Sequence, residues 1–152
     1  MSTTVADTPP AAAGGGRYRI GKSFKFEAAH RLGDLPDHHK CARVHGHSYA
    51  VEVTLVAQDL SGPGFVVDFA ELEPVKQYLA DTFDHRLIND VVTVEPTSEN
   101  LARLIFDWCA EKLPLPDGVR VEAVKVSETA TSWAEYRISV PAKGDDLVVY
   151  RG

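Results

Sequence analysis

One short stretch of the chain gathers residue types that bind metal ions: His30, Cys41, His45 and His47. Five of the six histidines lie between positions 30 and 47, which is a strong compositional bias. Neutral imidazoles suit zinc, and a site with only three protein ligands keeps a coordination position open for water or substrate. The pattern therefore predicts a zinc site of the kind that takes part in chemistry.

Strand geometry explains how three of these rings could reach one ion. His45 and His47 are two positions apart at the head of residues 45–56, a run with strand character, so they point to the same face. His30 closes a second such run, residues 18–30, whose alternate positions are mostly apolar. Two neighbouring strands would then present His30, His45 and His47 as one cluster of metal ligands.

The other histidines of this stretch have a simpler interpretation. His38 and His39 lie in a loop rich in proline and aspartate, residues 34–40, where we expect them to be solvated. A pair such as His45 and His47 can also occur on a strand without binding a metal. The third imidazole at compatible spacing is what favours the metal site over this alternative.

The size and composition of the chain restrict the class of protein. A chain of 152 residues, 44% of them hydrophobic, fits a single domain with one core, which we place at residues 17–152. Residues 1–16 lack the pattern of a signal peptide and end in a run of proline, alanine and glycine, so we expect a flexible tail. The net charge of −6 argues against a general nucleic-acid binder, and no stretch is apolar enough to span a membrane.

The two cysteines bear on the redox environment. Cys109 lies inside a helical pattern, and nothing else in the sequence indicates a scaffold held by disulfides. We therefore expect Cys41 and Cys109 to remain unpaired, in a reducing, cytoplasmic setting.

Helical periodicity predicts two helices in the middle of the chain. The first helix follows a cap at Asp68. Pro74 has no amide donor, so either the regular part of this helix begins near Glu73 or its first turn is distorted. The second follows a cap at Thr97 or Ser98. Its apolar stripe contains Leu101, Leu104, Ile105 and Trp108.

Two further alternating runs, residues 119–129 and 133–140, predict a second pair of strands. The order along the chain is then strand, strand, helix, helix, strand, strand. This order predicts an α+β architecture, an antiparallel sheet of four strands with two helices on one face. The opposite face of the sheet would need a cover, which an oligomer could provide.

Six motifs, taken together, resemble one family: residues 26–30, 41–47, 68–72, 83–85, 96–100 and 127–129. Their order and number make the resemblance specific, and it extends from about residue 17 to residue 140. It is to the 6-pyruvoyltetrahydropterin synthase superfamily. The cysteine four residues before the first histidine of the His-Gly-His motif is similar to the bacterial 6-carboxytetrahydropterin synthase branch, which serves 7-deazaguanine (queuosine-type) biosynthesis.

The resemblance implies a tunnelling fold (T-fold), in which the sheets of several subunits join into a barrel. It implies a homohexamer, a dimer of trimers, with active sites at the subunit interfaces. The implied substrate is 7,8-dihydroneopterin triphosphate, which the carboxy branch converts to 6-carboxy-5,6,7,8-tetrahydropterin with loss of acetaldehyde and triphosphate. Two alternatives stay open: a 6-pyruvoyltetrahydropterin synthase, which removes only triphosphate, and a non-catalytic zinc- or pterin-binding module.

The resemblance also implies roles for the residues of the metal cluster. Zn²⁺ on His30, His45 and His47 would act as a Lewis acid toward the side chain of the substrate. Cys41 would be the catalytic base, because a thiol beside a cation has a pKa closer to neutrality than its usual value of about 8.5. The alternative is that Cys41 is a fourth zinc ligand, which would close the site.

Further residues resemble the acid–base and substrate-binding groups of the family. Asp84 and His85 resemble a second acid–base pair, although a histidine here could also simply lie at the carbonyl end of the first helix. Glu128 resembles the carboxylate that anchors the pterin by a bidentate pairing. Glu99 could have a related binding role, or it could complement the positive end of a helix dipole.

Other residues near these motifs have open roles. Lys40, Arg43 and Arg86 lie close to the proposed site in sequence and could contact the triphosphate. Trp133 could shape the substrate pocket or simply pack against neighbours.

Overall fold

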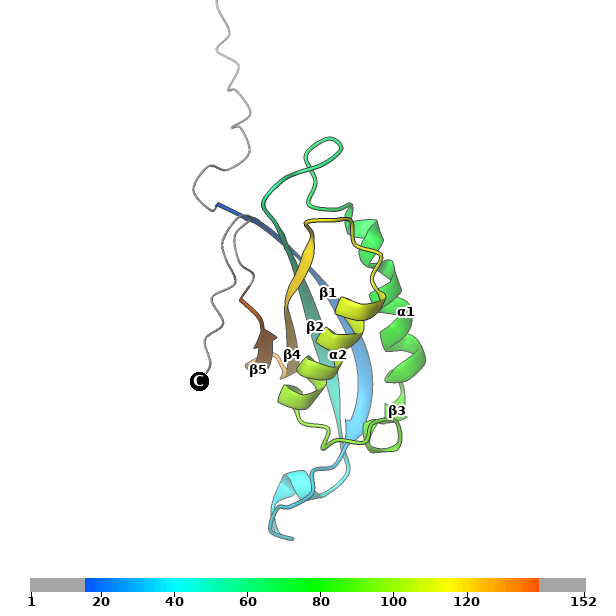
Figure 1. The fold of residues 1–152 in the computed structure, drawn as a ribbon. Coiled ribbons are helices and arrows are strands. Elements are labelled where there is room, and N and C mark those ends of the chain that lie inside the picture. Colours follow the sequence, from blue (N-terminus) through cyan, green and yellow to red (C-terminus); the bar gives the residue numbers. More distant parts are fainter. Residues whose placement is uncertain (1–15, 140–152) are drawn as a thin grey trace, which may run out of the picture.

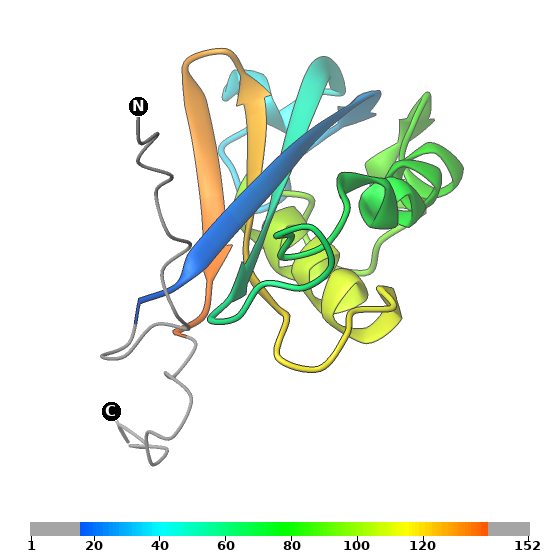
Figure 2. The same ribbon diagram turned by 90° about the horizontal axis from the view of Figure 1, so that it is seen from above.

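The computed structural model describes residues 16–139, which form a five-stranded sheet with two helices against one face (Figure 1, Figure 2). The strands lie in the order β3-β1-β2-β4-β5. All but the last residue of the predicted tail, and residues 140–152 of the predicted domain, lie outside the described residues. The elements are β1 (Tyr18–His30), β2 (His45–Ala57), α1 (Glu73–Thr82), β3 (Arg86–Leu87), α2 (Ser98–Lys112), β4 (Arg120–Thr129) and β5 (Ser132–Arg137).

The sheet has five strands rather than the predicted four. The four long strands pair antiparallel, and their predicted order along the chain is confirmed. The additional strand, β3, is two residues long and pairs in parallel with Ala28 and Ala29 of β1. Two residues carry no alternating pattern, so hydrophobic periodicity could not reveal this strand. Its pairing holds the preceding turn against the end of β1.

Both helices begin where the local chemistry predicts. Asp68 accepts a hydrogen bond from a backbone amide (2.9 Å) and caps a short 3-10 turn. α1 follows directly at Glu73, and Pro74 lies in its first turn, where no amide donor is needed. Thr97 caps α2 by accepting a hydrogen bond from the Asn100 amide (3.1 Å). Within residues 16–139, neither helix has the length and apolar character that a membrane crossing requires.

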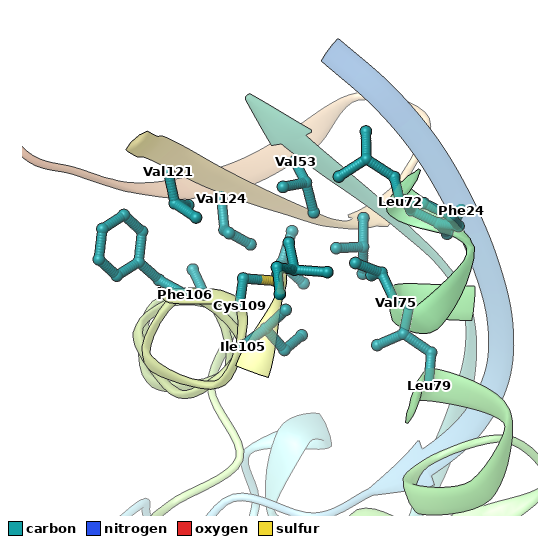
Figure 3. Packing of buried hydrophobic residues seen from close by; sticks show 14 of the residues in the cluster. Phe24, Val53, Leu72, Val75, Leu79, Ile105, Phe106, Cys109, Val121 and Val124 are labelled. Carbon is teal, nitrogen blue, oxygen red and sulfur yellow. The ribbon is translucent and has the colours of Figure 1, made fainter. Parts of the chain in front are cut away.

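One apolar core fills the space between the sheet and the helices (Figure 3). α1 packs over β1, and α2 packs over β4 and β5. Along α2, Leu101 and Ile105 are buried as predicted, whereas Leu104 and Trp108 are only partly buried. The strands contribute alternate residues from one face, and the histidines of the predicted metal site continue the same face beyond the core. The core thus fixes which way those rings point.

The opposite face of the sheet is largely polar. The carboxylate of Glu122, which is almost fully buried, accepts hydrogen bonds from Arg19 (2.6 Å) and Arg137 (2.7 Å). These bonds tie β1, β4 and β5 together across the sheet. Trp133 is 60% exposed, and the Lys125 ammonium lies 4.5 Å from its ring centre. A face of this composition can contact water or polar groups of another chain.

Candidate metal centre and adjoining cavity

The three predicted metal ligands come together where β1 ends and β2 begins. His30 and His45 are register partners, and His47 pairs with Ala28 two positions further along. Nε2 of His30 lies 2.9 Å from Nε2 of His45 and 3.1 Å from Nε2 of His47. Among residues 16–139, these three form the one group whose ligand atoms could converge on a metal ion. The strand pairing therefore builds the cluster that the sequence spacing predicts.

Hydrogen bonds on the far side of two rings determine which nitrogen is free to bind. Nδ1 of His30 donates to the Pro96 carbonyl oxygen (2.7 Å), and Nδ1 of His45 donates to the Arg43 carbonyl oxygen (2.7 Å). Because a carbonyl oxygen only accepts, each neutral ring carries its proton on Nδ1 and a lone pair on Nε2. Two lone pairs that face each other at 2.9 Å repel unless a cation lies between them. The donor set thus fits a zinc ion held through Nε2 atoms.

The third ring is also available as a neutral ligand. Burial lowers the pKa of His47 below its ordinary value of 6.5; the Glu128 carboxylate opposes this shift, and the imidazoles of His30 and His45 reinforce it. A neutral imidazole can lend its lone pair to a metal ion. The buried ring of Tyr49 packs edge-on against His47 and His30, with ring centres 5.4 Å and 6.0 Å apart. This packing restricts rotation of both imidazoles.

Glu128 lies beside the cluster, near the end of β4. Its Oε1 atom is 3.9 Å from Nε2 of His30, and its Oε2 atom is 3.8 Å from Nε2 of His47. The side chain is 26% exposed, so it can contact both the cluster and a bound molecule. A carboxylate in this position can balance the charge of a cation or accept hydrogen bonds from N–H groups of a ligand.

Cys41 lies in the loop that connects β1 to β2, within a 3-10 turn at Lys40–Ala42. Nδ1 of His39 caps this turn by accepting a hydrogen bond from the Cys41 amide (3.1 Å), and His39 is exposed, as is His38. The thiol of Cys41 is free, partly exposed, and outside the described group that could share a metal ion. This geometry favours a free thiol over a fourth ligand. Cys109, in contrast, is buried, and burial raises its pKa to about 12.

Asp84 and His85 contact each other and dock onto the edge of β1. Oδ2 of Asp84 lies 2.9 Å from Nδ1 of His85, and Oδ1 accepts a hydrogen bond from the Glu27 amide (2.9 Å). The amide of His85 donates to the Glu27 carbonyl oxygen (2.6 Å). The hydrogen bond from the Glu27 amide, followed by the contact with His85, lowers the pKa of Asp84. The carboxylate therefore stays ionised and holds the imidazole in one orientation.

The backbone of His85 has an uncommon conformation. Its φ is +57°, in the left-handed region that most non-glycine residues avoid. The hydrogen bond from the His85 amide to the Glu27 carbonyl oxygen holds it there, and the side chain is 78% exposed. Strained residues of this kind concentrate at functional sites, where the surrounding structure stabilises them.

A cavity of about 550 Å³ lies against the ends of β1 and β2 that carry the metal ligands, beside His85. His47 and His85 both line it, although they come from elements far apart in sequence. Its wall also contains Glu27, whose carboxylate accepts a hydrogen bond from the Ser48 hydroxyl (2.6 Å). A cavity of this size accommodates a small organic molecule. The lining residues are Glu27, Ala28, Ala29, Gly46, His47, Ser48, His85, Arg86 and Leu87.

The other predicted site residues differ in position. Arg86 lines the cavity, whereas Lys40 and Arg43 are exposed on the loop that carries the thiol. Glu99 is exposed in the first turn of α2, where a carboxylate complements the helix dipole. Its location matches the structural alternative that the sequence left open.

Sequence reasoning missed the groups that orient the imidazoles. The carbonyl oxygens of Pro96 and Arg43 have no signature in the sequence, because every residue carries one. It also missed Glu27, which anchors Asp84 and His85 through its backbone. The identity of Glu27 gives no indication of this role.

Comparison with known proteins identifies relatives. The sequence profile described as 6-pyruvoyl tetrahydropterin synthase matches residues 19–139. The 6-carboxy-5,6,7,8-tetrahydropterin synthase of Synechocystis sp. is 41% identical over 128 residues, which cover 77% of this chain and 91% of the relative. The protein of that name from Bacillus subtilis is 33% identical over 135 residues, covering 84% and 88%.

A solved structure supports the same assignment. The 6-pyruvoyl tetrahydropterin synthase of Caenorhabditis elegans matches with a TM-score of 0.70 and 28% identity, covering 82% of this chain and 97% of that chain. The profile match spans the sheet and both helices, including the strands that carry the histidine cluster. This chain therefore belongs to the 6-pyruvoyl tetrahydropterin synthase family.

Proposed function

We propose that this protein is a zinc-dependent lyase that converts 7,8-dihydroneopterin triphosphate and one molecule of water to 6-carboxy-5,6,7,8-tetrahydropterin, with release of acetaldehyde and triphosphate. The observation that carries the proposal is the meeting of three Nε2 atoms beside a carboxylate, where one of the three ligands, His47, also lines a cavity that contains His85. The names of the relatives from Synechocystis and Bacillus subtilis support the carboxy product. The product would enter 7-deazapurine (queuosine-type) biosynthesis in the cytoplasm.

Each step of this reaction needs a residue type that the site supplies. Zinc bound by His30, His45 and His47 would supply Lewis acidity that polarises oxygen atoms of the substrate. Cys41 would remove a proton from the substrate side chain, since its thiol is free and lies on the loop between the strands that hold the ligands. This role requires the thiol to approach the bound substrate from that loop.

A second proton-transfer group would operate from the other side of the cavity. His85 would exchange a proton with the substrate, and Asp84 would keep its ring oriented and stabilise its charged form. Breaking the carbon–carbon bond requires proton movements at more than one atom, so two separate acid–base groups suit the reaction. Glu27 would support the pair, because its backbone amide holds the Asp84 carboxylate and its carbonyl oxygen holds the His85 amide.

Charged side chains would bind both ends of the substrate, the pterin ring and the triphosphate. Glu128 would accept hydrogen bonds from the amino group and ring N–H of the pterin, and Glu99 would have a related role if it reached the ring. Arg86, which lines the cavity, would contact the triphosphate together with Lys40 or Arg43. We further propose that a homohexamer, a dimer of trimers with the tunnelling arrangement, completes the active sites at subunit interfaces.

Product analysis tests the proposed reaction. The zinc-loaded protein is incubated with 7,8-dihydroneopterin triphosphate, and the products are identified by mass spectrometry. We expect 6-carboxy-5,6,7,8-tetrahydropterin together with acetaldehyde and triphosphate. Triphosphate without acetaldehyde would instead establish a 6-pyruvoyltetrahydropterin synthase, the activity named for the related worm structure. Binding without turnover would leave a zinc- or pterin-binding module.

The role of Cys41 has a separate test. The Cys41→Ala variant should retain a full equivalent of zinc and lose turnover, because a base is removed while the three imidazoles remain. Cys109→Ala is the matched control, since that thiol is buried within α2. Loss of zinc from the Cys41→Ala protein would establish the fourth-ligand alternative.

A further inference from the structure

The segment that precedes α2 contacts two separate parts of the proposed site. The carbonyl oxygen of Pro96, a buried residue, accepts the hydrogen bond from Nδ1 of His30. Its neighbour Glu95 is exposed, and Oε2 of its carboxylate accepts a hydrogen bond from the Gly33 amide (2.9 Å). Gly33 belongs to the loop that leads from the first metal ligand to Cys41. Two consecutive residues therefore contact a metal ligand and the loop of the thiol.

The start of that loop is held at three consecutive residues. Asn89 accepts from the Arg31 amide and donates to the Arg31 carbonyl oxygen, each at 2.9 Å. Glu95 holds Gly33, as described above. Between them, the amide of Leu32 donates to the carbonyl oxygen of Cys41 (2.9 Å). The backbone of Cys41 is thus bound to a short segment that Asn89 and Glu95 anchor.

Glu95 is itself fixed at the beginning of α2. Its carbonyl oxygen accepts hydrogen bonds from the Thr97 amide (2.8 Å) and from Nδ2 of Asn100 (2.9 Å). Thr97 is the cap of α2, so these bonds tie the Glu95 backbone to the first turn of a helix packed on the sheet. The Glu95 carboxylate therefore extends toward the loop from a backbone that is bound to the start of α2.

We propose that Glu95 is a positioning residue, which holds the loop of Cys41 in register with the metal ligand His30. It would not touch the substrate. It would act through Gly33 and Leu32, so that the short segment before α2 sets both the orientation of the His30 imidazole and the position of the Cys41 thiol. The catalytic meaning of this coupling rests on the function proposed above, whereas the coupling itself does not.

The hydrogen bond between the Gly33 amide and the Glu95 carboxylate can be broken from either residue. A Cβ atom added at Gly33 would lie 2.7 Å from Oε1 of Glu95, so Gly33→Ala would push the carboxylate away from the Gly33 amide. The displaced group is the end of a flexible side chain, so the fold should tolerate the change. The Glu95→Gln variant should keep this contact, because the amide oxygen of its side chain can still accept the hydrogen bond from the Gly33 amide.

The test measures the reactivity of each thiol in the full-length, zinc-loaded protein. Iodoacetamide alkylation of Cys41 and Cys109 is followed by mass spectrometry in the wild type and in Glu95→Ala, Gly33→Ala and Glu95→Gln. Glu111→Ala is the matched control, since Glu111 is an exposed glutamate at the other end of α2. The absorption spectrum of the cobalt-substituted protein reports the geometry of the histidine cluster.

We expect the alkylation rate of Cys41 to change by about two- to tenfold in Glu95→Ala and Gly33→Ala, which is the range expected from losing one hydrogen bond. Glu95→Gln should restore the wild-type rate, and Glu111→Ala should not differ from it. The cobalt spectrum should persist in every variant, because Pro96 still holds His30 through its backbone.

Three results would overturn the proposal. Unchanged Cys41 rates in both Glu95→Ala and Gly33→Ala would show that the contact does not position the loop. A Glu95→Gln rate equal to that of Glu95→Ala would show that the acceptor oxygen is irrelevant. Alkylation of Cys109 alongside Cys41 would show general loosening of the fold. If the thiol rates behave as expected but the wild type has no turnover, the proposed function fails and the positioning role stands.

Discussion

Removal of one imidazole offers a direct test of the metal site, and His47→Ala is the most informative substitution. His30 is 1% exposed, so its replacement would also leave a cavity in a buried region, whereas the side chain of His47 is 17% exposed. Replacing His47 should therefore cost less folding free energy. The Nε2 atoms of His30 and His45 would still face each other, but the third ligand would be lost.

The expected magnitude follows from the linkage between binding and folding. Zinc at about one hundred times its Kd stabilises a folded protein that binds it at one site by about 2.7 kcal/mol. For a chain of this length, 1 kcal/mol corresponds to roughly 2–4 °C in Tm, so zinc should raise the Tm of the wild type by roughly 5–11 °C. In His47→Ala, the same zinc concentration should produce a much smaller rise.

The assay is thermal unfolding of chelator-stripped protein during a zinc titration. His38→Ala is the matched control, because His38 is an exposed histidine in the same part of the chain and lies outside the cluster. Its zinc-dependent rise should equal that of the wild type. An equal rise in His47→Ala, or its loss in His38→Ala, would refute the assignment of the three ligands.

Three further predictions follow from the described geometry. In the native protein, iodoacetamide should modify Cys41 and spare Cys109, whose pKa of about 12 keeps it protonated; peptide mass spectrometry after brief labelling checks this, and equal labelling would contradict it. The pKa of Asp84 is lowered on folding, so its stabilising contribution is present above its ordinary value of 3.8 and is lost as pH falls through the lower, folded value. The difference in Tm between the wild type and Asp84→Asn should therefore shrink as the pH falls below the folded pKa of Asp84. A difference in Tm that persisted at such low pH would show that the ionised carboxylate does not cause it. Leu79→Ala should lower the free energy of unfolding by about 2–5 kcal/mol in a urea titration, because Leu79 is 1% exposed within the core; a loss below about 1 kcal/mol would mean that the core there is loosely packed.

Local patterns accounted for much of the fold. The alternation around His30 and His45 placed both residues at strand ends, and the structure pairs those ends. Pro74 and Thr97 marked the helix starts because amide donors and cap acceptors are local requirements. β3 escaped prediction, since its two residues pair only because the preceding turn docks on β1.

The sequence alone determined the chemistry that is available: three imidazoles on matching faces of two strands, a thiol on the loop between these strands, and an Asp-His pair after the first helix. Residue type and strand periodicity suffice for this, because side-chain direction along a strand is a local property. Tertiary structure decided how the groups are oriented. Nδ1 of His30 meets a carbonyl oxygen 66 residues away, and Glu128 reaches the cluster from β4. Such contacts depend on how α2 and β4 pack, which no local pattern encodes.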